Sequence, residues 1–197
     1  MLKKLIPEFF IFFLYLICFL ITARILFPIQ IELLESKPLA GRDIKLLSAA
    51  LVFLPHGVRV ISTVVYGLRS LIPLFCAHVL TGLTFISDIY LLIPLALTGT
   101  LCVWLSIHMI FRRINGLSLE QITFKNIILI AFISSILNSI GNYVTKMVLI
   151  DHYGTLFNQE LFLYILGDFL GTILLFFLYI KWLKKYLMKF IGGNVSL

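Results

Sequence analysis

The sequence predicts an all-α membrane protein: a polytopic transmembrane bundle of about six helices, with the second helix broken near Pro55–Gly57. Of the 197 residues, 61% are hydrophobic and only 13% are charged, which is too apolar for one soluble core of this size. The apolar residues form long runs without the period-two alternation of a transmembrane barrel. Basic residues gather at the ends of these runs, as topology signals do.

The first apolar run covers about residues 5–27 and follows Lys3 and Lys4. Its basic start is similar to that of a signal peptide. The run is longer than a signal peptide, however, and no small-residue cleavage site follows it, so we interpret it as a retained membrane anchor. Residues 28–45 mix acids and bases with a proline and a glycine, which predicts a loop.

Five further runs are long enough, or nearly so, to cross a bilayer. The second run is interrupted by Pro55, His56 and Gly57, and Arg69 lies in a tight connection to the short third run. We expect these runs to form a single integral membrane domain over residues 1–197, with no soluble domain. The spans after the first are predicted at about 44–66, 71–86, 89–111, 127–150 and 161–180.

The formal charge of +7 is distributed as in a membrane protein rather than as in a protein that binds nucleic acid. With six spans both termini lie on one side, and the positive-inside rule predicts that this side is the cytoplasm, in the inner (plasma) membrane of a bacterium. The basic residues assigned to that side are Lys3, Lys4, Arg69, Arg112, Arg113, Lys125 and the lysines of the tail at 181–189. The acidic residues assigned to the other side are Glu32, Glu35, Asp43, Asp88, Asp151 and Glu160.

An acidic residue, Asp168, lies inside the apolar stretch LFLYILGDFLGTILLF. A charge near the bilayer centre costs roughly 2.5 to 3.5 kcal/mol on insertion scales, so we expect it to have a partner or a task. At about 1.5 Å per residue, Arg59 lies at a similar depth, and we predict that it is the partner, with Lys146 as second choice. The pair either fixes helix packing alone or forms part of a site.

The fifth predicted helix carries five polar residues at spacings of three and four, which places them on one face. They are Ser135, Asn138, Asn142, Thr145 and Lys146. Such a stripe lines a hydrated cavity or joins helices through hydrogen bonds. His56 lies in the helix break, where irregular backbone must be buried or line a cavity. The candidate ligand-binding or buried polar network is therefore His56, Arg59, Asn138, Asn142, Lys146 and Asp168.

Small residues and proline mark the expected helix contacts. Gly167 and Gly171 flank Asp168 at a spacing that permits close approach of another helix, and Pro55 and Gly57 mark the break. We expect neither a metal nor a cofactor, because Cys18, Cys76 and Cys102 lie in apolar runs with no CxxC spacing. His78 is interpreted as a core histidine.

The order of these features resembles the membrane-associated sensor domains of the MASE type, first subfamily. The stretch FLPHGVRVISTVVYGLRSLIPLF contains Pro55, Gly57, Gly67 and Pro73 of one family motif, and YILGDFLGTILLF contains Gly167, Asp168 and Gly171 of the other. Two positions depart from the family pattern: His56 replaces the usual serine, and Ile72 replaces the aromatic residue before proline. Family members usually signal to a fused cytoplasmic enzyme. Because this sequence ends soon after KWLKKYLMKF, the resemblance implies a stand-alone sensor-like module that acts through a separate partner or through none.

Three classes of function compete at this point. The leading expectation is a non-enzymatic sensory or ligand-binding module that signals by helix repacking to a cytoplasmic signalling protein or to a second copy of the chain. The alternative is the substrate-capture subunit of a vitamin-type importer. Catalysis ranks third, because Cys76 and His78 are two residues apart and so face different sides of a helix. The lipid bilayer is the expected environment and no nucleic acid is expected.

Overall fold

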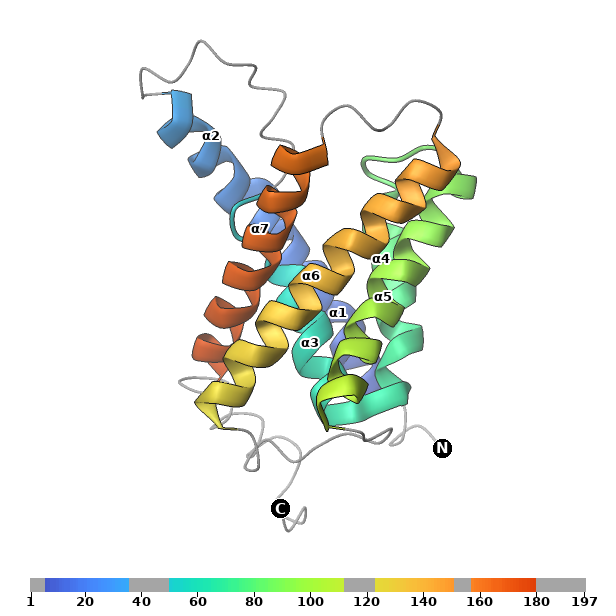
Figure 1. The fold of residues 1–197 in the computed structure, drawn as a ribbon, viewed down its shortest axis with the longest axis vertical. Helices are drawn as coiled ribbons and strands as arrows, with labels where there is room; N and C mark the ends of the chain where they lie inside the picture. Colours follow the sequence, from blue (N-terminus) through green and yellow to red (C-terminus); the bar gives the residue numbers. More distant parts are fainter. Residues whose placement is uncertain (1–5, 36–49, 112–122, 151–156, 180–197) are drawn as a thin grey trace.

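The computed structural model of the protein describes residues 6–35, 50–111, 123–150 and 157–179 (Figure 1). Its helices are α1 (Ile6–Ile21), the π-helix η2 (Thr22–Leu26), α2 (Phe27–Glu35), α3 (Leu54–Tyr66), the 3-10 helix η4 (Gly67–Ser70), α4 (Leu71–Gly82), α5 (Ile89–Phe111), α6 (Phe124–Leu149) and α7 (Phe157–Leu178). The predicted all-α membrane bundle is confirmed. Five helical stretches in this part of the chain are long and apolar enough to cross a membrane, which makes it a multi-pass membrane protein: Ile6–Glu32, Leu54–Gly82, Ile89–Phe111, Lys125–Leu149 and Leu161–Leu178.

The first helix continues further than the sequence predicts, because α2 extends to Glu35 through a segment expected to be a loop. The hydrogen-bond spacing of the helix changes from four residues to five at η2, where the N–H of Phe27 donates to the carbonyl of Thr22. Pro28, which follows, has no N–H to donate, and it falls where the α-helical pattern is already interrupted. The rest of the predicted loop, from residue 36 on, lies outside the described residues.

The interruption predicted at Pro55–Gly57 is the place where α3 begins. Pro55 lies in the first turn of α3, where a missing backbone N–H costs little stability. Phe53, the residue just before α3, is not helical. Residues 44–49 of the predicted second span lie outside the described part of the chain. With 13 residues α3 is about 20 Å long, too short to cross a bilayer alone.

The chain reverses direction after α3. Gly67 has φ 57° and ψ −134°, a backbone conformation that side-chain-bearing residues rarely adopt, and η4 then leads into α4. Figure 1 shows α3 running from the middle of the bundle to its lower end and α4 running back up beside α5. The helical run Leu54–Gly82 therefore does not cross as one straight helix: it folds back at Gly67, and the predicted second and third spans correspond to its two legs, α3 and α4.

Replacing Gly67 by alanine should destabilise the protein by about 1 to 2 kcal/mol, because a Cβ is strained at this backbone conformation. Unfolding in mixed micelles, followed by circular dichroism, measures the change. The neighbouring Leu68→Ala, at a side chain that is 45% exposed, is the control and should change stability much less. Equal losses in both variants would contradict a special role for the glycine backbone.

The other helices agree closely with the predicted spans and surround α3. The helix α5 has the predicted bounds, whereas α6 and α7 begin three and four residues earlier than expected. All residues from Leu54 to Val64 of α3 are buried, so this short helix forms the centre of the bundle and packs on α1, α5, α6 and α7. At the lower end a cluster of apolar side chains fills the space between α3, α5, α6 and α7. This lower apolar cluster consists of Val60, Ile61, Val64, Val103, Ile107, Ile127, Ile130 and Phe176.

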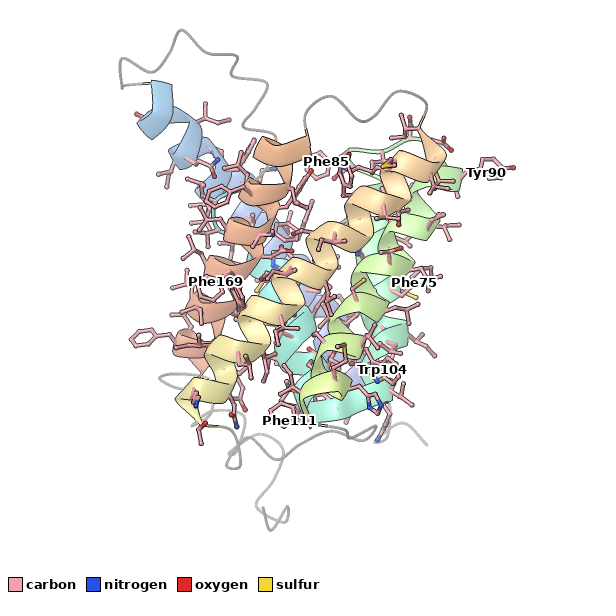
Figure 2. All side chains as sticks on the ribbon, in the orientation of Figure 1. Phe75, Phe85, Tyr90, Trp104, Phe111 and Phe169 are labelled. Carbon is pink, nitrogen blue, oxygen red and sulfur yellow. The ribbon has the colours of Figure 1, made fainter. Side chains whose placement is uncertain are left out.

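The outer surface of the bundle is apolar, as a lipid environment requires. Phe9 and Phe13 on α1, Met109 on α5 and Val148 on α6 are each more than half exposed. Figure 2 shows Tyr90 standing away from the start of α5, where an amphipathic ring suits the membrane interface. The polar side chains described next are instead turned inward.

Candidate functional site

A short non-helical segment at residues 50–53 precedes α3 and lies beside the middle of α7. Two of its backbone N–H groups bond to neighbours on different sides: the N–H of Leu51 donates to Gln30 Oε1 at 2.6 Å, and the N–H of Phe53 donates to the carbonyl of Gly167 at 2.9 Å. The first N–H of α3, that of Leu54, reaches Thr22 Oγ1 at 3.3 Å. Irregular backbone at membrane depth is tolerated where it is packed within the protein and its polar groups are bonded there. The bonded N–H groups of this pre-helix segment meet that condition.

The close approach of the pre-helix segment to α7 depends on Gly167 and Gly171. A Cβ at Gly167 would collide with the carbonyl oxygen of Ala50, and one at Gly171 would collide with the backbone of Phe53. Gly57 in the first turn of α3 faces Gly171 at similarly short range. The predicted packing role of these glycines therefore has a definite partner, and the contact brings Asp168 next to the start of α3.

Arg59 and Asp168 are both buried, and Asn138 of α6 lies between them. Arg59 Nη1 donates to Asn138 Oδ1 at 3.2 Å, while Asn138 Nδ2 donates to Asp168 Oδ2 at 2.5 Å. Arg59, the partner predicted for Asp168, is thus connected to it through an amide. An asparagine can do this because its side chain carries both an acceptor and a donor.

His56 contacts the other side of the carboxylate. Its Nδ1 lies 3.4 Å from Asp168 Oδ2, and its Nε2 lies 3.2 Å from Ser134 Oγ on α6. The imidazole is completely buried. His56, Arg59, Asn138 and Asp168 thus form one polar cluster that joins α3, α6 and α7.

A cavity of about 970 Å³ extends from this polar cluster to the α4–α5 turn and the end of α6. These two elements lie at the upper end of the bundle in Figure 1. The upper wall of the cavity includes Thr84 and Phe85 in the α4–α5 turn and Ile150 after α6. Its inner wall includes Arg59 and Asp168. A cavity at membrane depth with a mostly apolar wall and a few polar groups, lined by residues of α1 to α7, is the arrangement expected of a small-molecule site.

The polar stripe on α6 divides between two roles. Asn138, Asn142 and Lys146 line the cavity, and Asn142 Nδ2 donates to Asn138 Oδ1 at 3.1 Å. Ser135 instead donates to the carbonyl of Ala131 in its own helix, and Thr145 hydrogen-bonds to Thr98 of α5. Of the predicted network, Arg59, Asn138, Asn142, Lys146 and Asp168 line the cavity, whereas His56 does not.

Lys146 lies at the upper part of the cavity. Its Nζ is 3.4 Å from Tyr164 Oη and 5.0 Å from the centre of the Tyr164 ring, so the ammonium contacts the aromatic face as well as the hydroxyl. This places Lys146 away from Asp168, as its predicted position nearer the membrane surface implies.

Several lining residues were not predicted. Arg24 and Tyr164 line the cavity, as does Ser139, whose buried Oγ has no hydrogen-bond partner among the described residues. Gly99 of α5 leaves room for Arg59: a Cβ there would lie 2.5 Å from Nη1. Ser139 follows Asn138 directly, so the spacing that selects Asn138 and Asn142 omits it.

His78 and Cys76 lie on different sides of α4. His78 lines the cavity, and its buried Nδ1 has no hydrogen-bond partner in the described chain. Cys76, by contrast, is exposed on the outer surface of the bundle. The two do not meet as a nucleophile and its base. In the described ranges no group of three His, Cys, Asp or Glu side chains is arranged to hold a metal ion.

Fold and site together define a multi-pass helical membrane protein with a charged cluster at the inner wall of a cavity. Comparison of the chain with protein-family models, with curated proteins and with solved structures found no match.

Proposed function

We propose that the protein is a non-enzymatic ligand-binding module of the membrane that takes a small molecule into the cavity and responds by shifting its helices. The observation that carries the proposal is the cavity itself, which reaches from the upper end of the bundle to Arg59 and Asp168. The resemblance to MASE-type sensor domains agrees with a sensory role. We further propose the inner membrane of a bacterium, with both termini in the cytoplasm, as its setting.

The pre-helix segment supplies a route from the cavity to the helices. Phe53 lines the cavity and lies 6.0 Å from the Arg59 guanidinium, and its backbone N–H is bonded to Gly167 of α7. A ligand that displaces the Phe53 ring changes the packing of α3 against α7 at the same time. The response would then pass to a separate cytoplasmic protein or to a second copy of the chain.

Filling the cavity tests the proposal. We expect some members of a broad small-molecule library to raise the melting temperature of the purified protein, because a ligand that binds only the folded state stabilises it. Ser139→Trp places a large ring at the buried, cavity-lining Ser139 and should abolish these shifts.

Ile140→Trp is the matched control. It adds the same ring one residue along α6, at a side chain that is 44% exposed and does not line the cavity, so ligand-induced shifts should remain. The proposal is wrong if no compound stabilises the wild type, or if the shifts survive in Ser139→Trp as they do in Ile140→Trp.

The cavity also favours a second candidate, the substrate-capture subunit of a vitamin-type importer, because such a subunit needs a pocket that is reached from one end of the bundle. The two candidates differ in their partner. A capture subunit should co-purify with an energising subunit and drive uptake of its ligand. A sensor should bind without accumulating ligand in vesicles.

A further inference from the structure

We infer that the ligand is an anion with an apolar, preferably aromatic, body, and that its anionic group binds at Arg59. This inference rests on the proposed function and adds the chemical class of the ligand. Carboxylates and phosphates share the required chemistry, and the anion is either a free small molecule or the head group of an anionic lipid.

The charges on the cavity wall favour an anion. Of the lining side chains that belong to the described residues, Arg24, Arg59 and Lys146 are basic, whereas Asp168 alone is acidic. Arg24 lies in η2 and Lys146 in the last turn of α6, whereas Arg59 belongs to the polar cluster at the inner wall. An excess of charge of one sign along a low-dielectric cavity attracts ions of the opposite charge from solution and concentrates them there.

The bonding of Arg59 is incomplete. The side chain is 1% exposed, its Nη1 donates to a neutral amide oxygen, and its buried Nε has no hydrogen-bond partner in the part of the chain that the structure describes. A guanidinium presents donors in a planar fork that matches the two oxygens of a carboxylate or a phosphate. An anion beside Arg59 would supply the missing acceptor.

Asp168 does not supply that acceptor, because Asn138 lies between it and Arg59 and donates to its Oδ2. Two further buried atoms at the cavity, Ser139 Oγ and His78 Nδ1, have no partner among the described residues and add hydrogen-bonding capacity for a ligand. Most of the remaining wall is apolar. Its aromatic members are Tyr15, Phe19, Phe27, Phe53, Phe85 and Tyr164.

Matched probes test the sign of the ligand charge. Phenylacetate, phenyl phosphate, phenylacetamide and phenethylamine share one ring and differ in charge, and their dissociation constants can be measured on the protein in nanodiscs of phosphatidylcholine. We expect at least one anion to bind about 10-fold or more tightly than the amide and the amine, because hydrogen bonds to a charged group are the stronger ones. The preference should disappear in Arg59→Gln and remain in Arg69→Gln, which lies at the opposite end of the bundle in η4.

Two further variants keep the inference testable if Arg59→Gln does not fold. Arg24→Gln should weaken anion binding several-fold, and Asp168→Asn should strengthen it, because the latter removes the acidic side chain from the wall. Changes in the opposite directions would overturn the inference.

Nanodiscs that contain phosphatidylglycerol distinguish the two sources of the anion. Retention of this lipid through purification, dependent on Arg59 and detected by native mass spectrometry, identifies a lipid head group. Binding of the free probes without lipid retention identifies a soluble anion. Binding of the amide or the amine at least as tight as that of the anions, and sensitive to Ser139→Trp, overturns the anion assignment but leaves the proposed function in place. Absence of binding by every anion, free or lipid, also overturns the assignment.

Discussion

Asn138→Leu should lower the free energy of unfolding by about 2 to 4 kcal/mol, because it removes the hydrogen-bonding partner of two buried charges while it keeps the branching and the number of heavy atoms of the side chain. Arg59 Nη1 would lose its acceptor, and Asp168 Oδ2 would lose its donor, in one substitution. The expected loss exceeds that of an ordinary intramembrane hydrogen bond, which averages well under 1 kcal/mol, because uncompensated charge remains. Denaturant titration in mixed micelles measures it.

Ser135→Ala provides the control for Asn138→Leu. Ser135 lies on the same helix and is equally buried, but it donates to the carbonyl of Ala131 in its own helix and contacts neither charge. We expect it to change stability by less than about 1 kcal/mol. A loss in Asn138→Leu no larger than that in Ser135→Ala would mean that Arg59 and Asp168 can move together into a direct pair.

Gly171→Ala should destabilise the protein by roughly 2 to 3 kcal/mol through overpacking. The added methyl group would meet the backbone of Phe53, which cannot rotate away as a side chain can. Ligand-induced stabilisation should weaken as well, because Phe53 lies on the cavity wall and follows the displaced backbone. Thermal unfolding with and without ligand measures both effects.

The matched control is Gly141→Ala on α6. Its methyl group would meet the Sγ of Cys102 and the methyl of Thr98, the outer ends of side chains that can adjust. A smaller loss of stability, with ligand response intact, is expected. If Gly141→Ala costs as much as Gly171→Ala, the rigid contact between the pre-helix segment and α7 is not what distinguishes Gly171.

Much of the fold follows from hydrophobicity and helix punctuation. The bounds of α5 agree with the apolar run, and Pro55 marks the start of α3 as it marks a break in the sequence pattern. The extension of the first helix to Glu35 could not be predicted in this way, because it depends on a π turn. Hydrogen bonding at Thr22, rather than composition, allows the helix to pass Pro28.

The members of the polar cluster could be predicted from the sequence, but their connections and several other cavity-lining residues could not. Depth along the helices selects Arg59 and Asp168 as neighbours, and helical spacing selects Asn138. Depth alone does not reveal that Asn138 lies between the two charges, because this depends on how α6 is rotated relative to α3 and α7. The cavity role of Ser139 depends on the same rotation, and so does the turn of Thr145 toward Thr98.

The lower apolar cluster has a consequence for permeation. Water that enters the cavity meets the buried side chains of Val64, Ile107 and Phe176 below Arg59, and these offer no hydrogen-bonding groups. Within the described residues, ions therefore meet an apolar barrier and not a continuous hydrated path through the bundle. Liposomes that contain the protein should hold a proton gradient as long as empty liposomes do, and leakage through the wild type would show that the barrier opens spontaneously.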